Sequence, residues 1–282
     1  MSEVDQVLQS IERLPPFPAV VFRALQLLED PRTSAQDLVD VLHLDPAITA
    51  NVLRLCNSAY FGLKKKVHSL KEAIILVGFQ PLLEIILSQQ SIGLLKKPCQ
   101  GYDLGQVDLW KHSVACALLT RIISKRLDWQ MTYVPFTAAL LHDIGKMILG
   151  QFFQGHFMEI KRLVHEEGFS FTEAEREVLG IDHAELGGKV AEYWKFPGIM
   201  ISAIRFHHTP AQSFGDSEMV ELIRLCDMIA LMTGIGVGAD GLAYRGDDGL
   251  LRRHHLRSRE VESFIVQLEE QFRLVNETLN VN

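Results

Sequence analysis

The sequence has few cysteines and no long apolar run, and both features narrow the class of protein. Its four cysteines (Cys56, Cys99, Cys116 and Cys226) lie far apart and form no Cys-x-x-Cys pair. Disulfides are therefore not expected, a reducing cytoplasm is the default, and Cys56, Cys116 and Cys226, each in an apolar run, are interpreted as buried thiols. No stretch of about 18 or more apolar residues occurs. The N-terminal sequence MSEVDQVLQSIERL also lacks the pattern of a signal peptide. A cytoplasmic protein with no membrane partner is the expectation.

The sequence also lacks an excess of positive charge and lacks the alternating apolar pattern of strands. The formal net charge is −7, which argues against a partner made of duplex nucleic acid, because contacts to phosphates need a basic face. Apolar residues make up 48% of the 282 residues, which is usual for a soluble globular protein. Their spacing is helical almost everywhere, as in Val20, Ala24 and Leu28. We therefore expect an all-α fold.

Capping residues and breaks predict how these helices are organised. Ser34, Asp45-Pro46 and Ser69 are typical starts of helices. A break near 96–105 separates an N-terminal helical part, residues 10–97, from a second helical part, residues 106–235. The remaining residues, 236–282, are predicted to form a flexible glycine-containing segment followed by an amphipathic helix.

An adjacent pair, His142 and Asp143, ends a run of small and apolar residues and is followed by Gly145 and Lys146. A carboxylate in such surroundings costs free energy unless it has a partner. A divalent cation is the commonest partner of a histidine combined with a carboxylate. The alternative is a hydrogen-bonded His–Asp pair near a helix end, without a metal.

Further histidines and carboxylates occur among apolar or small residues on other predicted helices. They are Asp108, His112, His183, His207, His208 and Asp227. One such residue would usually be a satisfied polar group of the core. Several of them on different helices predict a coordination shell that projects into a helical bundle. Asp108 precedes His112 by four residues and is expected on the same helical face.

The order His112, His142-Asp143, Asp227 resembles the H…HD…D pattern of the HD superfamily of metal-dependent phosphohydrolases. The sequence HDIGK, the later HAELG and the pair His207-His208 are similar to the two-metal HD-GYP phosphodiesterases. The N-terminal part resembles the HDOD subgroup in four segments: LPPFP from residue 14, LDPAIT from 44, RLCNSAYFG from 54 and SLKEAIILVG from 69. The resemblance covers roughly residues 10–235, and it implies an HD-domain-like helical bundle behind an N-terminal HDOD region.

The resemblance also implies a role for each matched residue. Asp143 would bridge two divalent metal ions. The types of donor atom suit iron, manganese, nickel or zinc, and do not distinguish among them. One ion would be held by His112, His142 and Asp227, and the other by His183, His207 and His208. Asp108 would add a ligand. Lys146 would contact a phosphate group, with a solvated lysine at a helix end as the alternative.

Two kinds of function agree with this resemblance. The first is a metal-dependent phosphohydrolase acting on a nucleotide or cyclic dinucleotide, in which a water activated by the two metals attacks phosphorus. The second is a non-catalytic module of bacterial signal transduction that binds a protein partner or a nucleotide. The absence of Gly-Tyr-Pro after His207-His208 favours the second kind. A basic run, Lys64 to Lys66, is either a contact for an acidic partner or a solvated loop tip.

Overall fold

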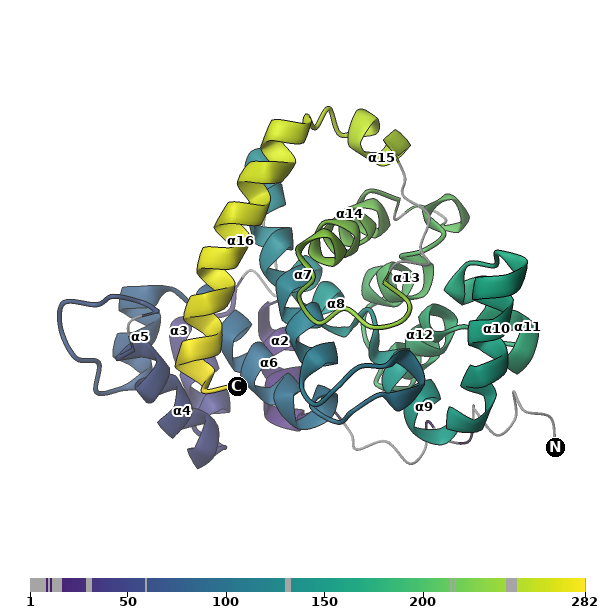
Figure 1. Cartoon of the computed structure of the whole chain (residues 1–282). Coiled ribbons are helices and arrows are strands. Elements are labelled where there is room, and N and C mark those ends of the chain that lie inside the picture. Colours follow the sequence, from purple (N-terminus) through teal and green to yellow (C-terminus); the bar gives the residue numbers. More distant parts are fainter. Residues whose placement is uncertain are drawn as a thin grey trace. The chain divides into compact units, whose positions relative to one another are not determined.

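The computed structural model describes residues 9, 11, 17–28, 32–58, 60–129, 133–213, 215, 217–241 and 248–281. These residues are predominantly helical and contain no strand, only an isolated antiparallel bridge between Cys99 and Leu104 (Figure 1). The prediction of an all-α fold is confirmed. None of the described helices combines the length and the apolar character needed to cross a membrane. Parts of the motifs named above, residues 14–16 and Ala59, lie outside the described residues, as does residue 10.

The chain folds into two compact units, which we describe separately. The first unit contains Met1–Leu14 and Leu94–Leu268, and the second contains Pro15–Gly93 and Glu269–Asn282. The divisions fall within two helices, α6 (Phe79–Leu95) and α16 (Ser258–Leu279). The first division lies beside the break predicted at 96–105.

The second unit is built from short helices whose starts follow the predicted caps. Besides parts of α6 and α16, its helices are α2 (Ala19–Leu28), α3 (Ala35–Leu42), α4 (Pro46–Cys56) and α5 (Leu70–Val77). The side chains of Ser34, Asp45 and Ser69 accept hydrogen bonds from backbone N–H groups in the first turns of α3, α4 and α5. These bonds satisfy donors that a helix start leaves free. Aliphatic side chains such as Val52 and Leu55 are fully buried and form the core.

The first unit holds α7 and α14, of 19 and 17 residues, and the polar residues singled out above. Its further elements are η1 (Gln100–Tyr102), α7 (Asp108–Arg126), α8 (Tyr133–Leu141), α9 (Ile144–Phe152), η2 (Gln154–His156), α10 (Phe157–Glu167), α11 (Phe171–Leu179), α12 (His183–Tyr193), α13 (Gly198–Phe206), η3 (Pro210–Gln212), α14 (Ser217–Thr233) and α15 (Asp248–Arg253). Helix α7 packs against α8 and α14, while α12 packs against α9 and α13. The turn between α8 and α9 therefore connects the helices that pack on α7 with those that pack on α12.

Glycine allows the close approach of α9 to α12. A Cβ atom on Gly145 would lie 2.0 Å from the carbonyl oxygen of His183 and 3.0 Å from the backbone nitrogen of Gly187. Any side chain at position 145 would push these two helices apart, because both contacts are with backbone atoms that cannot move alone. Gly145, two residues after Asp143, thus sets how closely His183 can approach the His142-Asp143 pair.

Candidate metal centre

The polar residues singled out in the sequence come from five places in the first unit. His112 lies within α7 and Asp227 within α14, while His142 and Asp143 form the turn between α8 and α9. His183 is the first residue of α12, and His207-His208 follow the end of α13. Ligands at helix ends and on facing helices can converge on one point in a bundle. All of these side chains except His208 are nearly or fully buried.

The structure brings seven of the predicted residues into two groups. The first group is His112, Cys116, His142 and Asp227, and the second is Asp143, His183, His207 and His208. Within each group, one potential ligand atom from every residue lies within 4.8 Å of the others. Both groups are therefore compact enough to hold a metal ion, and the first contains Cys116 in addition to the residues assigned from the sequence.

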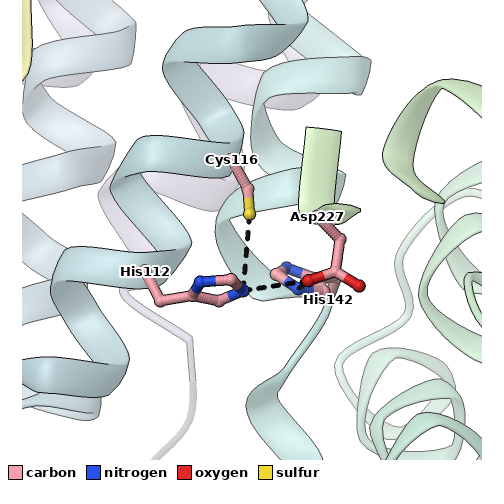
Figure 2. A group of neighbouring side chains, drawn as sticks. All are labelled: His112, Cys116, His142 and Asp227. Carbon is pink, nitrogen blue, oxygen red and sulfur yellow. Dashed lines mark hydrogen bonds and ion pairs between the residues drawn. The ribbon is translucent and has the colours of Figure 1, made fainter. Parts of the chain in front are cut away.

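The first group is centred on the Nε2 atom of His112 (Figure 2). This atom lies 3.1 Å from Oδ1 of Asp227 and 3.5 Å from Sγ of Cys116. Nε2 of His142 lies 3.8 Å from the same Asp227 oxygen. Two imidazoles, a carboxylate and a thiol thus face one another from three helical segments.

Asp143 faces both groups, one oxygen to each. Its Oδ2 lies 3.4 Å from Nε2 of His142 and 3.7 Å from Nε2 of His112. Its Oδ1 lies 3.5 Å from Nε2 of His183 and 3.7 Å from Nε2 of His207. A single carboxylate therefore presents its two oxygens to four imidazoles, two from each group.

The backbone fixes the ring orientation of two of these histidines. Nδ1 of His142 lies 2.7 Å from the carbonyl oxygen of Ala139, and Nδ1 of His207 lies 2.7 Å from that of Ile204. A carbonyl oxygen only accepts, so Nδ1–H donates in both cases and the neutral ring has its lone pair on Nε2. This is the tautomer that a metal bound at Nε2 requires.

A buried carboxylate does the same for His183. Oε2 of Glu175 accepts from Nδ1 of His183 at 2.7 Å and from the His183 backbone N–H at 2.9 Å. The other oxygen of Glu175 accepts from the hydroxyl of Tyr102 at 2.5 Å. Glu175 and Tyr102 are fully buried, and burial together with Glu175 raises the pKa of Tyr102 well above its ordinary value, so its hydroxyl keeps its hydrogen. Sequence reasoning missed both residues, because neither lies near a ligand in the sequence.

His208 differs from the other three histidines in its hydrogen bonds. Its Nδ1 lies 3.0 Å from a guanidinium nitrogen of Arg224, which can only donate, and its Nε2 lies 2.9 Å from Nε2 of His183. With Nδ1 accepting, the hydrogen of the neutral ring is on Nε2 and is donated to His183. His208 therefore belongs to the second group by distance, but in this arrangement its Nε2 is not free to bind a metal.

Several buried polar atoms lack a hydrogen-bond partner within the described part of the chain. They include Nε2 of His142, Nε2 of His207 and Oδ1 of Asp143. The lone pairs of these nitrogen atoms face the oxygens of Asp143 and Asp227, which are also acceptors. An acceptor that faces another acceptor in a buried site needs a proton or a cation between them. The donor types fit a divalent metal such as zinc or iron.

The pKa values of the buried carboxylates and histidines depend on the charges of their neighbours in the site. Burial opposes ionisation of Asp143, but His142, Lys146 and other cationic neighbours outweigh it and lower the pKa of Asp143. Burial lowers the pKa of His142, yet Asp143 and Asp227 together raise it overall. For His207 and His208, burial and the neighbouring imidazoles hold the pKa well below its ordinary value. The carboxylates are therefore ionised, and His207 and His208 are neutral.

Lys146 is buried rather than solvated. Only 3% of it is exposed, and its Nζ lies 2.7 Å from Oδ2 of Asp143 and 2.6 Å from Oδ2 of Asp240. The alternative of a solvated lysine at a helix end is wrong. Burial disfavours the ammonium, but Asp143 and Asp240 outweigh it and raise the pKa of Lys146, so the lysine is charged.

Asp240 comes from the segment that the sequence predicted to be flexible. This segment makes defined contacts: the N–H of Ala239 donates to the carbonyl oxygen of Tyr102 at 2.7 Å. A Cβ atom on Gly236 would lie 2.2 Å from the carbonyl oxygen of Asp108, and one on Gly238 would lie 2.2 Å from that of Tyr102. The glycines thus let the segment lie against η1 and α7, and they place Asp240 on Lys146.

Asp108 lies outside both groups. Its Oδ2 accepts from the N–H of Gly105 at 2.8 Å, and its Oδ1 lies 4.0 Å from Nζ of Lys111. Its side chain is 36% exposed. The carboxylate is therefore engaged at the start of α7, and the structure does not bring it to the residues that it was expected to join.

Comparisons with known proteins agree with this fold. A solved HDOD domain protein from Geobacter sulfurreducens is 24% identical, with a TM-score of 0.76 over 97% of each chain. A candidate phosphohydrolase from Shewanella amazonensis SB2B is also 24% identical, with a TM-score of 0.71 over 97% of each chain. A candidate signal transduction protein from Marinobacter aquaeolei VT8 is 23% identical, with a TM-score of 0.74 over 96% of this chain and 60% of its own.

Sequence comparison points to the same family. An uncharacterized protein of Treponema pallidum (strain Nichols) is 24% identical over 199 residues, which are 70% of this chain and 38% of that protein. This chain thus spans less than half the length of that relative. The HDOD domain model matches residues 14–210, most of the chain. The match covers the N-terminal motifs, the His142-Asp143 pair and the His207-His208 pair, and on this ground the chain belongs to the HDOD domain family.

Proposed function

We propose that the chain is a metal-dependent phosphohydrolase that acts on a nucleotide or cyclic dinucleotide through a site for two divalent cations. The observation that carries the proposal is the position of Asp143, whose two oxygens face two separate groups of imidazoles. Two divalent cations held by these residues would supply Lewis acidity and would lower the pKa of a water molecule at the site. The description of the Shewanella amazonensis protein as a candidate phosphohydrolase is in line with this chemistry.

The residues of this chain would divide the work as follows. His112, His142 and Asp227 would hold one cation, and His183 and His207 would hold the other, with Asp143 between them. His208 would join the second set once Arg224 releases its Nδ1, because only then can the ring carry its hydrogen there. Lys146, buried and charged beside Asp143, would contact a phosphate oxygen of the substrate.

Asp240 would limit this role of Lys146. Its Oδ2 lies 2.6 Å from Nζ of Lys146. A phosphate oxygen would make the same kind of contact with the ammonium group. A substrate phosphate would therefore compete with Asp240 for Lys146. The variant Asp240→Asn should lower the KM for a phosphate substrate, and Lys146→Met should raise it. An unchanged KM in both variants would remove Lys146 from the substrate site.

The test of the function is metal analysis combined with a hydrolysis screen. Purified protein should contain close to two equivalents of metal and hydrolyse at least one nucleotide or cyclic dinucleotide. Asp143→Ala should lose both properties, whereas His165→Ala, which changes an exposed histidine on α10, should keep both. Activity that survives in Asp143→Ala would refute the proposal.

A second candidate function is a regulatory module that binds a protein, and a surface of the second unit favours it. Ile75 and Leu76 on α5 are 69% and 50% exposed. They line a hollow together with Leu63, Lys64, Lys65, Ser69, Lys71 and Glu72. Its apolar part is aliphatic, which suits an amphipathic helix better than stacked bases. Its lysines exceed its single acidic residue, so the matching helix would be acidic.

This second candidate has its own experiment. A fluorescent helical peptide with leucines on one face and glutamates beside them is titrated with the protein. Binding should weaken in the double variant Ile75→Ser, Leu76→Ser and persist in Met158→Ser, which changes an 81% exposed methionine of the first unit. Equal binding of a peptide with the same residues in scrambled order, or no effect of the double variant, would reject this surface. Preferential binding of single-stranded oligonucleotide would also reject it.

A further inference from the structure

Cys116 lies among the candidate metal ligands although no sequence motif assigned it there. It follows His112 by four residues on α7, so both side chains lie on one face of the helix. Its side chain is fully buried. Its sulfur lies 3.5 Å from Nε2 of His112, and it belongs to the first group by distance. Figure 2 shows the sulfur directed toward the ring of His112 and the group's other ligand atoms.

The spacing of the ligand atoms agrees with one cation between them. Zinc–sulfur and zinc–nitrogen bonds of about 2.3 and 2.0 Å at a tetrahedral angle place the two ligand atoms about 3.5 Å apart. The sulfur of Cys116 and Nε2 of His112 are 3.5 Å apart. Nitrogen and oxygen ligands would be about 3.3 Å apart by the same construction of bond lengths. Oδ1 of Asp227 lies 3.1 Å from Nε2 of His112 and 3.8 Å from Nε2 of His142, which are on either side of this value.

An independent observation indicates a cation at this point. Nε2 of His142 is fully buried and has no hydrogen-bond partner in the described part of the chain. Its Nδ1–H is already donated to Ala139, so Nε2 presents a lone pair to the group. With the His142 ring neutral, a lone pair, a carboxylate and a sulfur converge in a buried space, and a cation bound between them would satisfy all three.

The other buried cysteines separate this arrangement from ordinary packing. A free cysteine usually behaves as a small apolar residue. Cys226 is equally buried and precedes Asp227 in the sequence, yet it belongs to neither group. Cys56 and Cys99 are buried as well and also lie outside the groups. Burial alone therefore does not explain why the sulfur of Cys116 joins the two histidines and Asp227.

We infer that Cys116 is a thiolate ligand of the metal ion held by His112, His142 and Asp227, and that this makes the position selective for zinc or ferrous iron over manganese or magnesium. The inference rests on the proposed two-metal site. On binding, the sulfur–metal bond forms and the thiol proton passes to solvent, so the charge of the dication is partly neutralised. Thiolate ligands favour zinc and iron, whereas manganese and magnesium favour oxygen ligands.

The first experiment is optical and needs no activity. Metal-free protein is titrated with cobalt(II), and the thiolate-to-cobalt charge-transfer band is followed in the near ultraviolet. The wild type and the matched control Cys226→Ser should show the band, and Cys116→Ser should lose it while retaining bound cobalt. A band of equal intensity in Cys116→Ser would overturn the inference. So would bound cobalt without the band in the wild type.

A second experiment uses the unchanged protein, so it does not depend on the folding of a variant. X-ray absorption of the zinc-loaded wild type should contain a sulfur scatterer at about 2.3 Å. Bound zinc with only nitrogen and oxygen scatterers would overturn the role of Cys116 and leave the two-metal phosphohydrolase intact. Failure to bind any metal would instead refute the proposed function itself. The two failures are thus distinguishable.

Selectivity gives the third measurement. Competition between zinc and manganese is measured for the wild type, Cys116→Ser and Cys226→Ser. Replacing the thiolate by a hydroxyl should reduce the preference for zinc at one of the two positions by at least about tenfold, which corresponds to about 1.4 kcal/mol. Cys226→Ser should match the wild type. An unchanged preference in Cys116→Ser would contradict the inference.

Discussion

The two compact units of this chain bury different kinds of side chain. The second unit has an aliphatic core, with residues such as Leu42, Val52 and Leu55 fully buried. The first unit buries an aliphatic core as well, but it also buries a cluster of ionisable groups that includes Asp143 and Lys146, whereas the second unit buries the carboxyl group of Glu84. Buried charges cost free energy unless they are paired or bind a cation. The first unit therefore holds both groups of candidate metal ligands, and the second is stabilised mainly by apolar packing and helix caps.

The largest expected effect comes from removing metal. Chelation should destabilise the first unit, because a ligand at a thousand times its dissociation constant stabilises the folded state by about 4 kcal/mol. Amide hydrogen exchange should accelerate in α7, α12 and α13 and stay unchanged in α3 and α4. A uniform response of both units, or none, would contradict the contrast between them.

A core substitution in the second unit should lower stability without affecting the metal content of the first unit. Leu55→Ala removes a fully buried side chain and should lower the free energy of unfolding by about 2–5 kcal/mol. Metal content should not change, because Leu55 belongs to the other unit and to neither group of candidate ligands. Denaturant unfolding and elemental analysis measure the two quantities. A loss of metal would show that the units are not independent.

Glu175 sharpens the comparison, since it is a buried carboxyl group that belongs to neither group of candidate ligands. Glu175→Gln weakens the hydrogen bond that Nδ1–H of His183 donates to residue 175. Metal affinity at the second group should therefore fall by about 10- to 100-fold. Calorimetric titration should show one weakened class of sites and one unchanged class. Equal weakening of both classes would indicate a general loss of structure.

A substitution of Arg224 should change metal affinity at the second group in the opposite direction. In Arg224→Gln, the amide oxygen can accept a hydrogen bond from Nδ1–H of His208, which the guanidinium cannot do. The Nε2 lone pair of His208 is then free, and metal affinity at the second group should rise. A fall in affinity would mean that Arg224 supports the site rather than restraining His208.

The smallest effect is expected at a helix cap of the second unit. Ser34 accepts from the N–H of Asp37, and the carboxylate of Asp37 accepts in return from the N–H of Ser34. Ser34→Ala should lower the free energy of unfolding by about 1 kcal/mol, with metal binding unchanged. Thermal unfolding of the variant measures the change. A loss above that of Leu55→Ala would contradict the view that apolar burial dominates this unit.

The sequence by itself determined the all-α fold and most of the candidate ligands. Helical spacing and caps such as Ser34 and Ser69 are local, so they can be recognised without a structure. The pair His142-Asp143 was recognisable because a carboxylate beside apolar residues needs a partner. Cys116 was within reach of the same reasoning, because it lies four residues after His112 on one helical face.

Only the tertiary structure decided how these residues are paired. Glu175 reaches His183 from another helix, and Asp240 reaches Lys146 from a glycine-containing segment that the sequence had predicted to be flexible. Asp108 lies on the predicted face, yet a local hydrogen bond at the start of α7 engages it. Spacing along one helix gives a face, but contacts between residues distant in the sequence depend on how helices approach. Here that approach is set by backbone contacts such as those at Gly145.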